Sequence, residues 1–319
     1  NYSPEIILGG TSETVQLSAG TGVNCSFTTI NINAGGEFID GGQTFNINGS
    51  WTNSGTCTMT GTVNFNGAAQ DITRGGTGAT KQFNILNHNG TGTLRILTDD
   101  IYIKGTFTNS SNTFDLNGLN MTVVGTLTIS GGTFDASTGT PNIYVGGSWS
   151  RPAGAFTYGT STVTFNTATA ATITANENFY NLIINKNAVG NTVTPSGALT
   201  VNNDLTVTQG TFNTNAGALG VTRDVLVNGA NGTFSPGATT VTVGRHWNRS
   251  AGTFTYGTST VNFNGTGDIV NGETFYNMTV SAGIRTQSNN ITVTNDIDIN
   301  GTGDYSPGNR MTSIGRHWS

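Results

Sequence analysis

The chain has 319 residues, a net charge of −5 and 9% charged residues, whereas a typical soluble domain carries about 25%. Small neutral residues take the place of the missing charge: 58 threonines, 46 glycines and 40 asparagines. Threonine favours pleated strands, and asparagine and glycine favour tight turns. The composition therefore predicts many short strands and excludes a mainly helical protein.

Charge and hydropathy exclude two classes of partner. The basic residues are scattered singly between Arg74 and Arg316, which argues against a nucleic-acid partner. No stretch approaches the roughly 20 apolar residues of a membrane-spanning helix, so we expect no membrane insertion. The histidines and cysteines lack the spacing of metal ligands, and we expect no metal and no cofactor.

Residues 1–48 form a partial copy of a repeat that becomes clear from residue 49 onward. They hold Cys25, and the second cysteine, Cys57, lies in the first full copy. Cys57 takes the place of Phe156 and Phe254 in the later copies, so we expect it to point inward as a buried thiol. A disulfide between Cys25 and Cys57 is the alternative, if the two lie on neighbouring turns of the fold in an oxidising compartment.

Three related segments define this long repeat. Trp149 begins the segment WSRPAGAFTYGTSTVTFN, and Trp247 begins WNRSAGTFTYGTSTVNFN, which is identical at 14 of 18 positions and starts 98 residues later. A shorter segment, WTNSGTCTMTGTVNFN, begins at Trp51. We therefore divide a single solenoid spanning 1–319 into long repeats at 49–146, 147–244 and, in part, 245–319.

A shorter period of 20 or 22 residues runs inside the long one. It relates the phenylalanines of two series: Phe114, Phe134 and Phe156, then Phe212, Phe234 and Phe254. Within each unit apolar residues alternate with threonine or asparagine, which is the pattern of half-buried strands.

A unit of this length, holding two or three strands of four to six residues, fits one turn, or rung, of a right-handed parallel β-helix. This all-β solenoid is the predicted fold. The alternative, a tandem array of β-sandwiches each about 98 residues long, gains nothing from the shorter period.

The strongest candidate for catalysis lies in the first long repeat, where Arg95, Asp99 and Lys104 stand close in sequence. Some elongated β-solenoids cleave acidic polysaccharides, and that chemistry needs acids, or an acid with a basic partner, at one unique place. The neighbouring Asp100 recurs in the next copy as Asp204, and a repeated acid is more simply a turn former. We expect no enzyme and keep a polysaccharide-processing site at these three residues as the alternative.

The tryptophans occupy one phase of the repeat: Trp51, Trp149, Trp247 and Trp318. Exposed indoles would offer flat apolar faces to sugar rings, whereas buried ones would be a recurring packing feature of one corner. We favour packing, shared with Phe156 and Phe254, and keep carbohydrate binding as the alternative.

Two histidines, His246 and His317, precede tryptophans in the repeated segment GRHW. The equivalent positions in earlier copies hold Ser50 and Ser148. A position that accepts serine is rarely catalytic, so the pattern predicts a structural role for these histidines.

The last residues, 315–319, read GRHWS and stop within a repeat, without a segment typical of a cap. An uncapped rung presents unpaired backbone donors and acceptors to any other strand. We therefore expect the array to continue into flanking repeats or to stack on other copies of itself.

The segments GSWSRPAGAFTYGTSTVTFN, ENFYNLIIN and ALTVNNDLTVTQGTFNTNAGALGVTRDVLVNG resemble Thr/Asn/Gly-rich β-strand repeats of large exported bacterial surface proteins and adhesin-like right-handed β-helices. The resemblance covers nearly the whole chain from about Gln43 onward. It implies an extracellular or cell-surface location and transfers no catalytic residue. We expect a structural subunit or stalk segment of an extracellular fibre, sheath or adhesin, with copies of itself and surface polysaccharide as partners.

Overall fold

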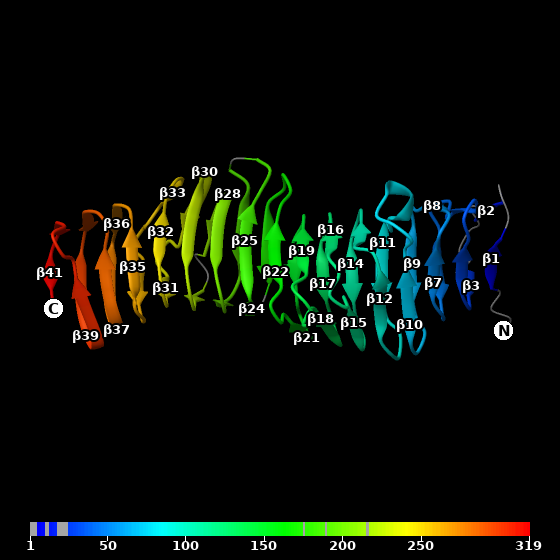
Figure 1. Cartoon of the computed structure of the whole chain (residues 1–319), viewed down its shortest axis with the longest axis horizontal. Helices are drawn as coiled ribbons and strands as arrows, with labels where there is room; N and C mark the ends of the chain where they lie inside the picture. Colours follow the sequence, from blue (N-terminus) through cyan, green and yellow to red (C-terminus); the bar gives the residue numbers. More distant parts are fainter. Residues whose placement is uncertain (1–4, 10–12, 18–24, 175, 189, 215–216) are drawn as a thin grey trace. The chain divides into compact units, whose positions relative to one another are not determined.

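The computed structural model describes residues 5–9, 13–17, 25–174, 176–188, 190–214 and 217–319. The protein is an all-β, parallel β-solenoid with 55% strand and about 15 turns (Figure 1). Its contacts divide it into two compact units, Asn1–Ser161 and Thr162–Ser319. The solenoid predicted from the 20- to 22-residue period is therefore confirmed.

The first unit contains strands of two to five residues and one short helix. In chain order they are β1 Ile6–Leu8, β2 Thr14–Gln16, β3 Cys25–Phe27, β4 Ile30–Ile32, β5 Glu37–Ile39, β6 Thr44–Ile47, β7 Trp51–Asn53, β8 Thr56–Thr58, β9 Thr62–Phe65, β10 Gln70–Thr73, η1 Ala79–Lys81, β11 Ile85–His88, β12 Leu94–Thr98, β13 Ile101–Ile103, β14 Phe107–Asn109, β15 Thr113–Asp115, β16 Met121–Val123, β17 Leu127–Ile129, β18 Thr133–Asp135, β19 Asn142–Val145, β20 Trp149–Ser150 and β21 Ala155–Thr157.

The second unit contains both short strands and strands of 9 to 11 residues. They are β22 Thr162–Phe165, β23 Ala171–Thr174, β24 Glu177–Phe179, β25 Asn181–Asn185, β26 Thr192–Pro195, β27 Leu199–Val201, β28 Leu205–Asn213, β29 Leu219–Val221, β30 Val225–Ser235, β31 Thr240–Val243, β32 Trp247–Arg249, β33 Thr253–Phe254, β34 Thr260–Phe263, β35 Gly267–Val270, β36 Glu273–Phe275, β37 Asn277–Gln287, β38 Ile291–Val293, β39 Asp296–Ser306, β40 Thr312–Ile314 and β41 His317–Trp318.

Strands of successive rungs pair in parallel and in register with the short period. In the first unit Phe114, Phe134 and Phe156 are direct register neighbours on β15, β18 and β21. In the second unit Phe212, Phe234 and Phe254 are neighbours in the same way. The β-sandwich alternative is wrong, because the described strands stack as parallel rungs and each series of phenylalanines forms one continuous ladder.

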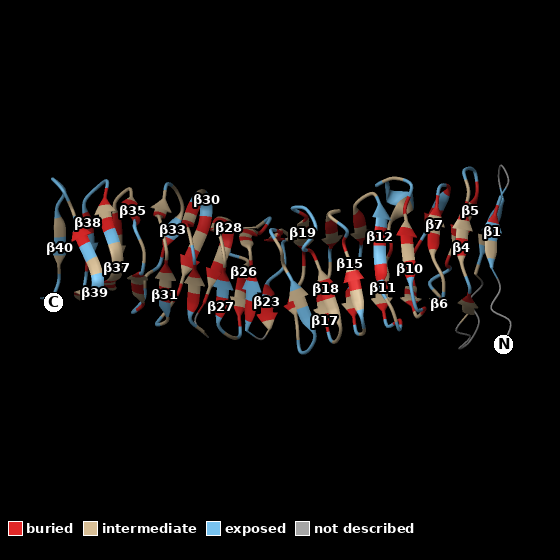
Figure 2. Ribbon diagram, turned by 60° about the horizontal axis from the view of Figure 1, so that its bottom comes forward, coloured by how far each residue is buried: buried red, intermediate tan, exposed pale blue. Residues whose placement is uncertain are grey.

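The core of each unit lies inside the rungs. Side chains alternate between buried and more exposed along the short strands, as in β17, where Leu127 and Ile129 are buried and Thr128 is not (Figure 2). Ring centroids of Phe114 and Phe134 lie 5.7 Å apart in a stacked arrangement. Stacking like residues in each rung therefore fills the interior, as expected from a pleated strand with one apolar face.

Glycines let the corners of successive rungs approach closely. A Cβ atom on Gly125 would lie 2.5 Å from the carbonyl oxygen of Gly105, and one on Gly147 would lie 2.8 Å from that of Gly125. Such distances are shorter than real Cβ contacts allow. This is a physical reason for glycine at one position in each of these three successive turns.

The helical content is negligible among the described residues. The helix η1 has three residues, and no helix in the described part of the chain is long and apolar enough to cross a membrane.

Candidate functional site

The tryptophans are mostly core residues. Trp51, Trp149 and Trp247 are at most 1% exposed, so they cannot offer an indole face to a sugar. Trp318, on the last strand, is 51% exposed and its ring contacts that of Tyr305. A row of exposed indoles is therefore not formed, and of the four tryptophans Trp318 alone could present its ring to a sugar.

A buried carboxylate fixes the tryptophan of the third long repeat. Glu273 accepts a hydrogen bond from Trp247 Nε1 at 3.0 Å and from Arg249 Nε at 2.9 Å. The Glu273 side chain is only 4% exposed. A charge so deeply buried needs such partners, because an unpaired one would be very costly.

The first long repeat reverses the charge at this position. Lys81 precedes Phe83 by two residues, as Glu273 precedes Phe275, and Asn53 takes the place of Arg249. Lys81 Nζ donates to the Asn53 carbonyl oxygen at 2.9 Å and to that of Gly55. Burial lowers the pKa of Lys81. In the first repeat Asn53 therefore accepts hydrogen bonds from the ammonium group of Lys81, whereas in the third repeat Arg249 donates one to the carboxylate of Glu273.

The cysteines are both free thiols, so the disulfide between them is not formed. Cys25 on β3 pairs with Phe45 of β6, whereas Cys57 on β8 pairs with Phe38 of β5 in a different sheet. Cys57 is 4% exposed, as expected for a residue in the place of an inward aromatic. Burial raises its pKa to about 11.

The aromatic residues at the equivalent positions pack against tryptophan. Phe254 is 8% exposed, and its centroid lies 4.7 Å from that of Trp247. Phe156 lies 4.8 Å from Trp149 but is partly exposed on β21. These two phenylalanines therefore pack against buried tryptophans, and Phe156 is less covered than a core residue.

The three residues of the polysaccharide-processing alternative contact different partners. Arg95 Nε pairs with Asp71 Oδ1 at 3.1 Å. Asp99, with a backbone φ of 58°, accepts from the backbone N–H of Gly76. Lys104 Nζ donates to the carbonyl oxygen of Met59. The structure thus engages each side chain in a separate structural contact.

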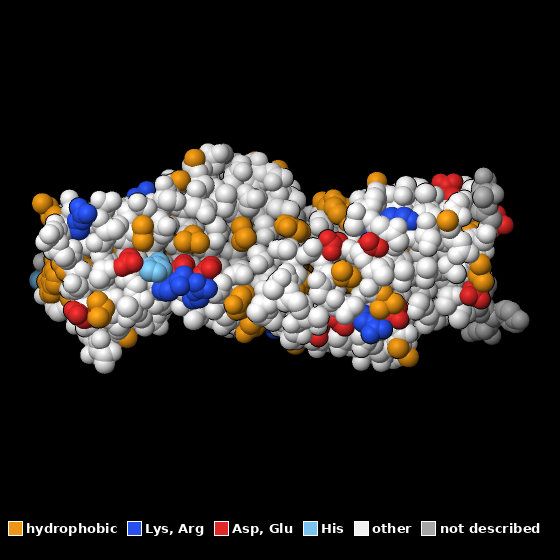
Figure 3. Space-filling model, viewed as in Figure 1, with side chains coloured by type: hydrophobic (Ala, Val, Ile, Leu, Met, Phe, Trp, Pro, Cys, Tyr) orange, Lys and Arg blue, Asp and Glu red, His pale blue; other side chains and the backbone are white. Residues whose placement is uncertain are grey.

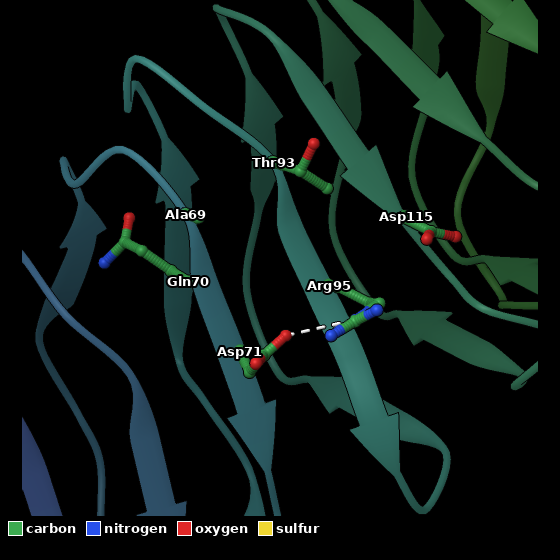
Figure 4. Close-up of a pocket in the computed structure, with 6 residues that line it drawn as sticks. All are labelled: Ala69, Gln70, Asp71, Thr93, Arg95 and Asp115. Atoms are coloured by element: carbon green, nitrogen blue, oxygen red, sulfur yellow. Dashed lines mark hydrogen bonds and ion pairs between the residues drawn. The ribbon is translucent and has the colours of Figure 1, made fainter.

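A shallow surface groove surrounds Arg95. We name it groove 1; its volume is about 310 Å³, and its lining residues are Ala69, Gln70, Asp71, Thr93, Arg95 and Asp115. Asp71 and Arg95 point toward one another from neighbouring strands (Figure 4). The register places Asp115 next to Arg95 on the following rung. The side chains of Asp71 and Arg95 remain 36% and 46% exposed, so groove 1 presents donors and acceptors to solvent.

A second groove lies on the second unit. Groove 2 has a volume of about 380 Å³ and is lined by Arg245, His246, Thr266, Gly267, Asp268, Ile284 and Thr286. His246 Nδ1 accepts from the backbone N–H of Asp268 at 3.0 Å, and Thr286 donates its hydroxyl to Asp268. In Figure 3 basic, acidic and histidine side chains lie together on the second unit.

The carboxylate of Asp224 holds the arginine of groove 2. Arg245 donates through Nε to Asp224 Oδ1 at 2.8 Å and through Nη2 to Asp224 Oδ2. Burial alone would raise the pKa of Asp224, but the hydrogen bonds from Arg245 and from the backbone N–H of His246 hold it below its usual value. The pairing also raises the pKa of Arg245. Asp224 therefore stays ionised and orients the guanidinium.

The two grooves occupy the same place in the long repeat. Asp71 precedes Ile72, which pairs with Trp51, and Asp268 precedes Ile269, which pairs with Trp247. Each aspartate N–H donates to the side chain before that tryptophan, at 3.0 Å: Ser50 Oγ in groove 1 and His246 Nδ1 in groove 2. The structural role predicted for His246 from its equivalence to serine is thereby supported.

The sequence reasoning missed Asp71, Asp115, Arg245 and Asp268. A signal was present, because Asp71 and Asp268 both stand in an Asp-Ile pair a few residues after the repeated Val-Asn-Phe-Asn. It could not show which side chains face the same groove, since residues of several successive rungs line each groove.

Within the described ranges, no group of three or more histidine, cysteine, aspartate or glutamate side chains is arranged to hold a metal ion. Comparison of the chain with known protein families, curated proteins and solved structures gives no significant match. The site therefore has to be interpreted from its own geometry.

Proposed function

We propose that this protein is a structural segment of an extracellular surface assembly: a stalk, sheath or fibre component rather than a catalyst. The observation that carries the proposal is the rung-to-rung register of the inward ladders, such as Phe114–Phe134–Phe156 and Phe212–Phe234–Phe254. Each added rung repeats the same backbone pairing and the same core contact, so the architecture can be extended without a new core.

The surface chemistry supports this role. The chain has few charges, and hydrogen-bonded asparagines connect successive rungs on the outside, as in Asn46–Asn64–Asn87 with donor–acceptor distances of 3.0 and 2.9 Å. Such ladders repeat one polar contact along the rungs and stay compatible with water. An end rung presents unpaired backbone donors and acceptors, which can pair with another strand. The proposal therefore includes stacking of rungs on other copies of the chain or on flanking repeats.

Labelling of intact cells of the source organism tests the location. An antibody raised against the folded chain should bind intact cells, and brief protease treatment of those cells should remove the signal. An antibody against a cytoplasmic protein serves as the control for cell integrity. Binding that appears only after the cells are permeabilised would contradict the proposal.

A further inference from the structure

Grooves 1 and 2 occupy equivalent positions in the long repeat. Each contains a partly exposed carboxylate, whereas their other lining residues differ. Asp71 and Asp268 share the same backbone contact, yet the partner of Asp71 on the next rung is Arg95 and that of Asp268 is Thr286. In the middle long repeat the corresponding strand, β23, carries no acid. The fold therefore does not require an acid at this position. The carboxylates of Asp71 and Asp268 are available to bind a ligand.

The chemistry of both grooves suits hydroxyl groups better than charged ligands. Each combines a carboxylate acceptor with an arginine donor: Asp71 with Arg95 in groove 1, and Asp268 with Arg245 among the residues that line groove 2. Carboxylates and a net charge of −5 disfavour an anion. A neutral sugar hydroxyl can donate to the aspartate and accept from the arginine at the same time.

Groove 2 also offers an apolar surface. Ile284 lines it and is 47% exposed, although large hydrophobic side chains are mostly buried in this protein. A sugar ring has an apolar C–H face and an edge of hydroxyl groups. The exposed aliphatic side chain can contact the C–H face, and the polar groups beside it can hydrogen-bond to the hydroxyl groups. The volumes of both grooves fall at the lower end of the range for small-molecule sites, about 300–1,000 Å³.

We propose that grooves 1 and 2 are two equivalent binding sites for uncharged oligosaccharides, with Asp71 and Asp268 as the central acceptors. This function is additional to the structural role and does not depend on it. Because the grooves are shallow and no phenylalanine, tyrosine or tryptophan ring lines them, each site binds weakly.

Titration of the full chain with uncharged hexasaccharides tests this proposal. The probes are cellohexaose, maltohexaose and mannohexaose, with hexagalacturonate as the charged comparison, and binding is followed by calorimetry and by NMR. We expect at least one uncharged probe to bind with a stoichiometry of two. Asp71→Asn and Asp268→Asn should each remove one site, and the double variant should weaken binding at least tenfold.

The matched control is Asp135→Asn, the same chemical change at an outward position that lies in neither groove. Asp135 accepts from the backbone N–H of Ser137, and an asparagine oxygen can replace that acceptor. The control should bind like the native chain, and thermal melting should show all variants folded. Absence of binding to every uncharged probe, binding to hexagalacturonate alone, or unchanged binding by the folded double variant would overturn the proposal.

Discussion

Lys81 and Glu273 show how single residues adapt one repeat position to opposite charges. Lys81 is satisfied by backbone carbonyl oxygens near Asn53, and Glu273 by Trp247 and Arg249. The choice at one position depends on the residue that faces it on another strand. Such coupling between positions is measured by the difference between a double variant and the sum of its single variants.

The first prediction concerns this coupling. Lys81→Glu should destabilise the protein, because the new carboxylate faces carbonyl oxygens, and Asn53→Arg should do so by opposing Lys81. The double variant recreates the arginine–glutamate pair of the third repeat and should be more stable than the sum of the single effects by about 1–3 kcal/mol. Urea unfolding of the four proteins measures this. Additive effects would contradict the assignment.

A second prediction concerns Lys186, which is fully buried and whose pKa burial lowers to about 8. Between pH 8 and the ordinary lysine pKa of about 10.4, the folded state carries the neutral amine while the unfolded chain is still protonated. Unfolding therefore binds a proton, and stability should rise with pH in this window.

Lys186→Met provides the comparison for that pH dependence. The variant should be more stable than the native chain at pH 7, by about 1 kcal/mol or more after allowance for solvent screening, and the difference should shrink toward pH 10. Urea unfolding at both pH values follows it. Parallel stability profiles for the two proteins would show that Lys186 does not titrate as described.

At the level of individual strands, sequence patterns predict most of this fold. The steps of 20 and 22 residues between Phe114, Phe134 and Phe156 give the rung length, and alternation gives the inward face. Strand length is predicted less well: most strands have two to four residues instead of four to six, whereas β28, β30, β37 and β39 run for 9 to 11.

A bend within the long strands explains the difference. The register of β28 shifts between Val207 and Gln209, and Gly210 has a φ of 82°. In β37 the shift falls between Val280 and Ala282, followed by Gly283 with a φ of 68°. Each strand continues its hydrogen bonding through a corner of the rung. At that corner the glycine and polar residues of the sequence predict a turn, and the predicted strand ends there.

At the scale of the whole molecule, the repeat produces two kinds of surface. Most outward positions hold threonine or asparagine and repeat the contacts of the rung before. The grooves depart from this pattern, because acids and arginines stand at Asp71, Arg95, Arg245 and Asp268. Sequence alone predicts the regular part from its period, whereas the grooves require knowing which side chains of successive rungs face outward together.

The proposed role requires that parallel rungs stack into an extended structure outside the cell. Electron cryo-microscopy of the protein as isolated from its source, without refolding, tests this most directly. We expect fibres or stalks with an axial spacing of about 4.8 Å and a longer repeat equal to a whole number of rungs. Isolated compact particles without that spacing would contradict it.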